Sequence, residues 1–231
     1  MEELRRLLLE RGASVVGFAD LGELPEGCRQ GFRYGVVIGV ALDRRIIASI
    51  EKGPNEEYVQ LYHRMNALLD KLTKTGVEFL TGRGYRAVAQ PATSRTASES
   101  EDLATVLPHK TVATRAGLGW IGKNALLVTK EFGTAVRLAT ILTDAPVEAG
   151  SPVNESQCGT CIECVKICPG QAPSGVNWKV GMSREEFFDA RACRQTSRNR
   201  PDNAHLSRRL CGVCIPACPH TRRYLKNLGA F

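Results

Sequence analysis

Eight of the nine cysteines in this 231-residue chain lie in its last third, in two runs with the same spacing. The first run reads C-x2-C-x2-C-x3-C-P, and the second repeats it with its first cysteine displaced upstream. In runs of this kind three thiolates bind one iron-sulfur cluster and the fourth binds the neighbouring cluster. The sequence therefore predicts two [4Fe-4S] clusters. The cysteines concerned are Cys158, Cys161, Cys164, Cys168, Cys193, Cys211, Cys214 and Cys218.

Cross-ligation between the runs divides these cysteines into two sets. The first set consists of Cys158, Cys161, Cys164 and Cys218, and the second set consists of Cys168, Cys193, Cys211 and Cys214. Paired zinc sites also use C-x2-C, but they do not need the additional cysteines and the Cys-Pro of both runs. The ninth cysteine, Cys28, stands alone in a polar loop, and we interpret it as incidental.

The N-terminal stretch MEELRRLLLERG is charged and amphipathic, which is not typical of a signal peptide. A disulfide framework would need an oxidising compartment, and this stretch indicates none. No window approaches the roughly 18 apolar residues of a membrane span. We therefore expect a cytoplasmic protein that does not interact with a membrane.

The basic excess of the chain is concentrated with the cysteines. Residues 151–231 contain 12 Lys and Arg against 6 Asp and Glu, whereas residues 1–150 contain 19 against 18. Two oxidised clusters, each with a net charge of about −2, would offset most of this excess. The arginines between the two runs are therefore interpreted mainly as partners for cluster charge. A surface for an RNA phosphate backbone is the alternative.

Hydrophobic patterning predicts a mixture of helices and strands before the cysteine runs. We expect helices at 2–11 and 54–74 and helical turns within 101–115, restarted at Pro108. We expect strands at 14–21 and 34–42, and a strand, a turn and a second strand within 77–91. We also expect a hairpin of two antiparallel strands, 124–130 and 134–143, joined at 131–133. The polar stretch 93–102 is expected to be a surface loop. A change in composition near residue 150 indicates a boundary between residues 1–150 and residues 151–231.

The segment AGLGWIGKN, residues 116–124, is the second motif that could form a site. Its glycines allow the backbone to approach a ligand closely, Trp120 offers a stacking face, and Lys123 offers a charge for an anionic group. The spacing matches neither the G-x-G-x-x-G motif that opens a helix after a strand nor a Walker loop. The alternative is a tight corner in which the tryptophan fills the core.

AGLGWIGKNALLV, ILTDAPVE and the order of the eight cysteines together resemble the later part of epoxyqueuosine reductases, which are related to reductive dehalogenases. The resemblance covers residues 105–220. It implies an α+β fold, with a nitroreductase-like domain that holds a cobalamin, followed by a two-cluster, ferredoxin-like domain. The residues that it places along the corrinoid are Gly117, Leu118, Gly119, Trp120, Gly122 and Lys123.

The chain departs from this family in a few places. Gln90 stands where the family carries an aspartate thought to donate a proton, and His220 replaces a tryptophan after the last Cys-Pro. We also expect the chain to lack the longer N-terminal region of full-length members and their C-terminal helical extension, which is associated with tRNA recognition. His109 is a candidate proton donor, and Lys110 and Arg115 are candidate contacts for an anionic group. The serines of the polar loop, Ser94, Ser98 and Ser100, have no visible base and are not expected to be nucleophiles.

These observations lead to one expected function and one alternative. The expected function is an iron-sulfur reductase that passes low-potential electrons through two clusters to a cobalamin and reduces a small electrophilic substrate. The alternative is an electron-transfer protein that serves a partner enzyme and has no substrate of its own. In either case the expected electron donor is a ferredoxin or a flavodoxin. Binding of tRNA is a third hypothesis, which we do not favour.

Overall fold

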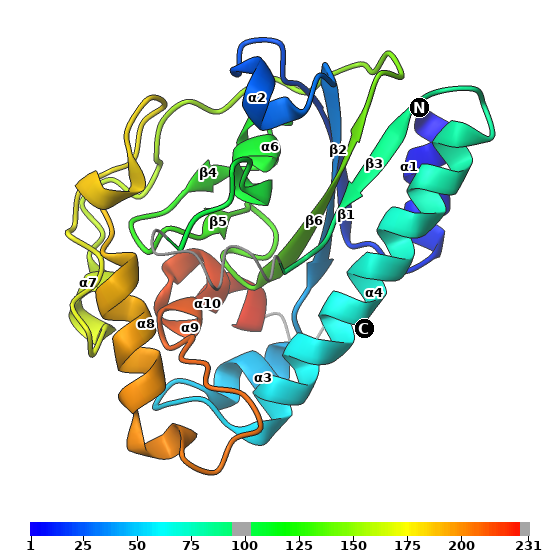
Figure 1. Ribbon diagram of the computed structural model, residues 1–231. Helices are drawn as coiled ribbons and strands as arrows, with labels where there is room; N and C mark the ends of the chain where they lie inside the picture. The colour runs from blue at the N-terminus through cyan, green and yellow to red at the C-terminus, as the bar shows by residue number, and fades with distance from the viewer. Residues whose placement is uncertain (94–102, 227–231) are drawn as a thin grey trace. The chain divides into compact units, whose positions relative to one another are not determined.

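The computed structural model describes residues 1–93 and 103–226, which form two compact units (Figure 1). Unit 1 comprises Met1–Ala41, Met65–Leu118 and Arg137–Val153, and unit 2 comprises Leu42–Arg64, Gly119–Val136 and Asn154–Phe231. Each unit is thus built from interleaved segments, and the expected boundary at residue 150 stays a prediction. Residues 94–102, which include the three loop serines, lie outside the described part of the chain.

Unit 1 is built around a four-stranded sheet with the order β1-β2-β6-β3. The pairs β1 with β2 and β3 with β6 are antiparallel, with Val16 opposite Ile38 and Ala89 opposite Ile141. The elements of this unit are α1 (Glu2–Glu10), β1 (Val15–Asp20), α2 (Glu26–Arg29), β2 (Tyr34–Ala41), most of α4 (Glu56–Thr81), β3 (Ala87–Gln90), α6 (His109–Arg115) and nearly all of β6 (Val136–Thr143).

Helices cover both faces of this sheet (Figure 1). On one face, the apolar sides of α1 and α4 form the core with alternate residues of the strands, including Val16 and Ile38. On the other face α6 lies against β1 and β2. Gly17 and Gly35 permit this contact, because a Cβ atom at either position would lie 2.9 Å from a side-chain atom of the α6 region. The expected strands at 14–21 and 34–42 thus correspond to β1 and β2.

The expected end of the long helix at Gly76 is wrong. The helix α4 continues to Thr81, so the expected strand after residue 77 is also wrong. Gly76 is an interior helix residue whose Cβ would lie 2.4 Å from Ile141 Cδ1, and the glycine therefore permits close packing of α4 on β6. Leu80 is fully buried in the same core. The second expected strand of this region is confirmed as β3.

Unit 2 contains short helices, turns and one two-stranded sheet. Its elements are α3 (Arg44–Ser49), the start of α4, β4 (Trp120–Ile121), β5 (Leu127–Val128), α7 (Glu163–Ile167), the 3-10 turn η1 (Arg184–Glu186), α8 (Ala190–Asn199), the 3-10 turn η2 (Pro201–Asn203), α9 (Cys214–Ala217) and α10 (Pro219–Lys226). Strand β5 pairs with β4, and β6 pairs with β3. The expected hairpin of strands 124–130 and 134–143 is therefore wrong, apart from an isolated bridge between Thr129 and Gly133.

Helix α10 is fixed within unit 2 by buried polar contacts. The Thr221 hydroxyl accepts a hydrogen bond from the Thr134 N–H at 2.9 Å, and the Tyr224 hydroxyl donates to the Leu42 carbonyl at 2.9 Å. Gly133 has no room for a side chain, since a Cβ atom there would lie 2.2 Å from the Thr221 nitrogen. The segment that carries the last cysteine is thereby held in place. Among the described residues, no helix has the length and apolar character that crossing a membrane requires.

Candidate metal centre

The two cysteine runs adopt the same local structure in unit 2. In each run a short helix, α7 or α9, ends at a Cys-Pro pair. Cys168 and Cys218 have extended backbones there, with ψ of 112° and 126°, because a residue that precedes proline avoids the helical conformation. The two helices pack against each other. Cys193 lies in α8, whose N-cap Asp189 accepts a hydrogen bond from the Ala192 N–H.

The thiols of the first set influence one another's charge. Burial raises the pKa of the Cys164 thiol to about 11, and repulsion from Cys158, Cys218 and Cys161 adds to this shift. Burial also raises the pKa of Cys218, with a further contribution from Cys158. The backbone N–H groups of His220 and Thr221 donate to Cys218 and oppose that rise. Cys218 comes from the second run, and the cysteines whose charges it shares in these shifts, Cys158 and Cys164, come from the first.

The thiols of the second set are related in the same way. Burial raises the pKa of Cys193 to about 11, and the charges of Cys211 and Cys168 add to the shift. Burial raises the pKa of Cys214 as well, with contributions from Cys193, Cys211, Cys164 and Cys168 in that order. Cys168 is the member that comes from the first run. Cys214 and Cys164 are the cysteines through which the two sets influence each other.

The arrangement of the thiols differs from that of a site for a single metal ion. Within residues 1–93 and 103–226, no three Cys, His, Asp or Glu side chains meet in a single-metal arrangement. A cubane cluster is larger than one ion and binds its four thiolates at separate corners. The assignment of all eight cysteines as cluster ligands stays a prediction.

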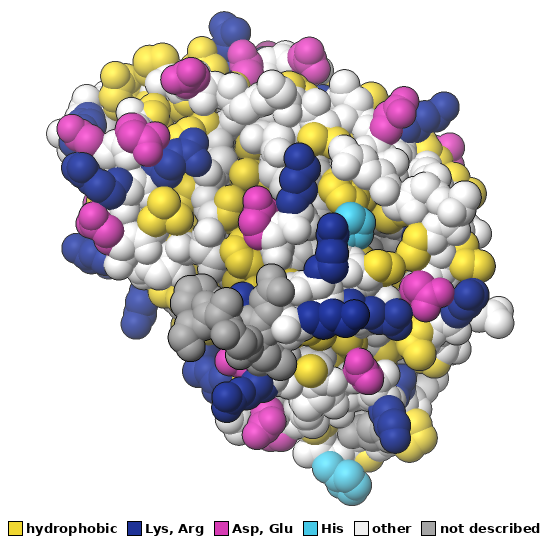
Figure 2. All heavy atoms as spheres, turned by 180° about the vertical axis from the view of Figure 1, so that it is seen from behind, with side chains coloured by type: hydrophobic (Ala, Val, Ile, Leu, Met, Phe, Trp, Pro, Cys, Tyr) yellow, Lys and Arg dark blue, Asp and Glu magenta, His cyan; other side chains and the backbone are white. Residues whose placement is uncertain are grey.

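The arginines of unit 2 contact backbone and ring atoms. Arg200 donates to the Lys52 carbonyl at 2.8 Å, and Arg209 donates to the Arg198 carbonyl at 3.3 Å. The guanidinium of Arg208 lies 4.9 Å from the centre of the Tyr62 ring. On the face drawn in Figure 2, basic side chains are interspersed with acidic ones. These contacts give several arginines a structural role within unit 2.

The glycine-rich motif is divided between the two units. In unit 2, Gly119 precedes β4, and a Cβ atom on it would lie 2.0 Å from the Val128 carbonyl oxygen. Trp120 is only 2% exposed, its ring contacts that of His220 edge-on at 4.9 Å, and its Nε1 has no hydrogen-bond partner among the described residues. Lys123 is 4% exposed, and its Nζ donates to the Gly159 carbonyl at 2.9 Å.

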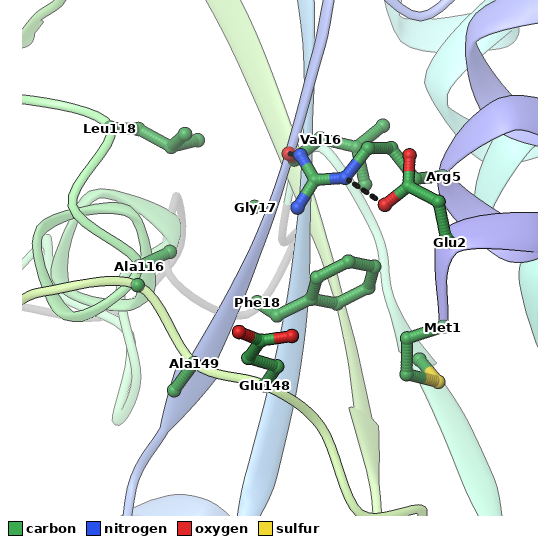
Figure 3. A pocket seen from close by; sticks show the side chains of 11 residues that line it. Met1, Glu2, Arg5, Val16, Gly17, Phe18, Ala116, Leu118, Glu148 and Ala149 are labelled. Carbon is green, nitrogen blue, oxygen red and sulfur yellow. Dashed lines mark hydrogen bonds and ion pairs between the residues drawn. The ribbon is translucent and has the colours of Figure 1, made fainter.

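The unit 1 part of the motif borders a cavity. Gly117, with φ of +73°, lies close to the Ser151 carbonyl, and Leu118 lines a cavity of about 660 Å³. Figure 3 shows the residues of α1, β1 and the segment after β6 that line it. Arg5 lies 3.3 Å from the Glu2 carboxylate and 4.8 Å from the centre of the Phe18 ring. The cavity thus combines an aromatic wall with an ion pair.

Comparison with known proteins identifies relatives over about half of the chain. No family model matches. The epoxyqueuosine reductase of Listeria monocytogenes is 36% identical over 118 residues, which are 48% of this chain and 29% of that protein. The epoxyqueuosine reductase of Lactococcus garvieae is 47% identical over 115 residues, 48% of this chain and 31% of that protein. This chain resembles epoxyqueuosine reductases. It spans about a third of the length of these curated relatives.

Solved structures share the fold over nearly the whole chain. An epoxyqueuosine reductase crystallised with an epoxyqueuosine-modified tRNA stem loop has a TM-score of 0.64 at 21% identity, covering 96% of this chain and 65% of that chain. A catabolic reductive dehalogenase in complex with 3-bromo-4-hydroxybenzoic acid has a TM-score of 0.71 at 17% identity, covering 96% and 32%. The expected mixture of helices with an antiparallel sheet is confirmed. The nitroreductase-like and ferredoxin-like descriptions of its parts stay predictions.

The resemblance to epoxyqueuosine reductases draws attention to Gln90. In the sheet Gln90 lies opposite Thr140, whose hydroxyl is 2.9 Å from Nδ1 of His109. The other ring nitrogen, Nε2, is 3.0 Å from the Pro91 carbonyl oxygen. A carbonyl only accepts, so Nε2 carries the proton and Nδ1 accepts from the Thr140 hydroxyl. The position of the expected acid and the candidate proton donor His109 therefore lie at the same end of β3, a relation that sequence reasoning missed.

We expect His109→Gln to reduce the acid sensitivity of folding. Burial lowers the pKa of His109, the hydrogen bond to Pro91 raises it in part, and the charge of Arg137 lowers it. The neutral ring therefore contributes stability that is complete above the unfolded pKa of about 6.5 and is lost as pH falls through the lower folded pKa. Urea unfolding measured at several pH values should show a shallower loss of stability in the variant.

The matched control for this experiment is His63→Gln, which removes an exposed histidine. It should keep the wild-type loss of stability at acid pH. Equal pH dependence in wild type and His109→Gln would contradict the role of the buried ring.

Proposed function

We propose that this chain is an iron-sulfur oxidoreductase that uses two [4Fe-4S] clusters to deliver low-potential electrons to a cobalamin, for the reduction of a small electrophilic substrate. The observation that carries the proposal is the packing of α7 against α9, the two short helices that each end at a Cys-Pro pair. The charge of Cys218 contributes to the raised pKa of Cys164, and the charge of Cys168 contributes to that of Cys193, which supports cross-ligation of two clusters. The similarity to proteins named epoxyqueuosine reductase supports a redox enzyme.

The donor set of the chain fits iron-sulfur clusters. Eight thiols in two sets of four supply the ligands of two cubanes, and no other residue type is needed. In this proposal residues 151–231 form the ferredoxin-like domain that receives electrons from a ferredoxin or flavodoxin. Residues 1–150 form the nitroreductase-like domain, and the part that holds the corrinoid belongs there.

Two of the residues expected at a corrinoid, Leu118 and Trp120, support such a group. In unit 1, Leu118 lines a cavity; in unit 2, Trp120 has a buried N–H without an acceptor among the described residues, although buried donors are almost always paired. Bound cobalamin supplies a strongly reducing cobalt centre suited to removing oxygen or halogen from carbon. The role of this chain's residues is to bind it, to exclude water and to orient the substrate. The substrate class remains a small electrophile, and tRNA is a candidate because a structural relative was crystallised with a modified tRNA stem loop.

One observation favours the alternative of an electron-transfer protein. Gln90 occupies the position expected for an acid, and an amide cannot donate a proton in the way a carboxylic acid does. In the alternative, electrons pass from the clusters to a partner enzyme, and residues 1–150 serve as its docking domain.

Metal analysis separates the two functions. The protein is purified without oxygen from cells supplied with cobalamin, and iron, cobalt and zinc are measured per chain. We expect about eight iron atoms and about one cobalt atom. Eight iron atoms with no cobalt, even after incubation with cobalamin, would favour the electron-transfer alternative. A colourless protein that contains zinc in place of iron would exclude both.

A further inference from the structure

Lys123 makes a buried contact with the loop that carries the first two cysteines. Its Nζ donates to the Gly159 carbonyl at 2.9 Å, and Gly159 lies between Cys158 and Cys161. Asn177 donates to the same oxygen from its Nδ2 atom at 3.1 Å. Gly159 itself has φ of +55°, a conformation that favours glycine. The loop is thus held by two donors on one carbonyl.

Lys123 projects from a rigid turn between β4 and β5. The Gly122 N–H donates to the Leu126 carbonyl at 2.8 Å, and the Ala125 N–H donates to the Gly122 carbonyl at 2.8 Å. Ile121 and Ala125 pack with Trp178 and Phe187 in an apolar cluster. Trp178 adjoins Asn177, so the two donors to Gly159 come from segments that pack on each other. The position of the ammonium group is therefore well defined.

Strand β4, which leads into this turn, contacts the segment that follows Cys218, the fourth cysteine of the first set. Trp120, three residues before Lys123, contacts the ring of His220, which lies two residues after Cys218. The turn therefore contacts both segments that supply the first set, the loop of Cys158 and Cys161 and the segment of Cys218. Trp120 and Lys123 together therefore hold both segments of the first set in place.

A buried ammonium group needs a compensating negative charge. Among the described residues, Lys123 has no ion pair with a carboxylate. A cubane with four thiolate ligands has a net charge of about −2 when oxidised, and reduction adds one more negative charge. A fixed positive charge close to the ligand loop favours the reduced form, because attraction grows with the added electron.

We propose that Lys123 is a positioning residue of the first cluster: it fixes the Cys158–Cys161 loop through the Gly159 carbonyl and raises the reduction potential of that cluster. This inference rests on the proposed function and gives Lys123 a role distinct from the corrinoid contact expected from sequence. The first cluster is then reduced in preference to the second.

The test is a redox titration with dithionite, followed by electron paramagnetic resonance on protein purified without oxygen. In Lys123→Gln the equilibrium constant for one-electron reduction of one cluster should fall about tenfold, equivalent to about 60 mV, with the other cluster unchanged. Lys123→Arg keeps the charge and should stay near the wild-type potential. Lys130→Gln removes an exposed lysine of the same unit and should change neither cluster.

The outcomes separate this inference from the proposed function. Wild-type protein without clusters would refute the function itself. Clusters with wild-type potentials in Lys123→Gln would refute the role of Lys123 and leave the function standing. If Lys123→Gln takes up too little iron for titration, the rate of iron loss to a chelator decides. If Lys123→Arg loses iron at the wild-type rate, the proposal is supported. If Lys123→Arg loses iron as fast as Lys123→Gln, the proposal is overturned.

Discussion

The double replacement of Cys168 and Cys193 by alanine is expected to leave one intact [4Fe-4S] cluster, with about four iron atoms per chain. Both cysteines belong to the second set, so that cluster loses two ligands while the first set keeps its four. The double replacement of Cys164 and Cys168 takes one ligand from each set. We expect it to leave no cluster with four thiolates, and the signal of reduced [4Fe-4S] should be absent from its electron paramagnetic resonance spectrum.

A linear assignment makes the opposite prediction. If each run bound its own cluster, Cys164 and Cys168 would share one, and their joint loss would spare the other. Cys168 and Cys193 would then belong to different clusters, and their joint loss would damage both. Cys28→Ala is the control for the loss of a cysteine outside both runs, and it should keep about eight iron atoms. The two double variants therefore decide between the assignments without knowledge of the substrate.

The common local structure of the two cysteine runs follows from their common spacing, whereas the division of the thiols between two clusters stays a prediction. Each run forms a short helix that ends at its Cys-Pro pair, because a residue before proline avoids the helical conformation. The same holds for β1 and β2, whose apolar runs are bounded by turn residues. Local signals predicted local structure correctly.

Predictions failed where a distant segment determined the outcome. Gly76 was expected to end a helix, but it permits contact with Ile141, which is far away in the sequence. Lys123 could not be paired with Gly159 in advance, because a backbone carbonyl 36 residues away carries no sequence signal. Thr140 had a weak signal, as a polar residue between the apolar Ala139 and Ile141 of β6. The spacing and periodicity of residues in a sequence do not reveal tertiary contacts of this kind.

Gly119 is the residue of the glycine-rich motif with the least room for a side chain. A Cβ atom there would lie 2.0 Å from the Val128 carbonyl oxygen and 2.9 Å from the Val128 carbonyl carbon. Both are backbone atoms of β5, which cannot rotate away as a side chain can. Removing this steric clash would require β4 to separate from β5. Strand β4 contains Trp120 and leads into the turn that carries Lys123. A single methyl group would thus disturb the contacts of this turn with both segments of the first set.

We therefore expect Gly119→Ala to destabilise the protein by about 3 kcal/mol, at the upper end for overpacking, and to lower the thermal midpoint by about 10 °C. Circular dichroism of anaerobically purified protein measures the midpoint, and iron analysis should show a loss from the first cluster. Gly27→Ala is the matched control, since a Cβ atom at Gly27 meets nothing within 4 Å and the residue lies in α2. That variant should be as stable as wild type, because alanine suits a helix at least as well as glycine. A wild-type midpoint in Gly119→Ala would show that β4 does not approach β5 as closely as this structure requires, and it would remove the basis for a rigid Lys123.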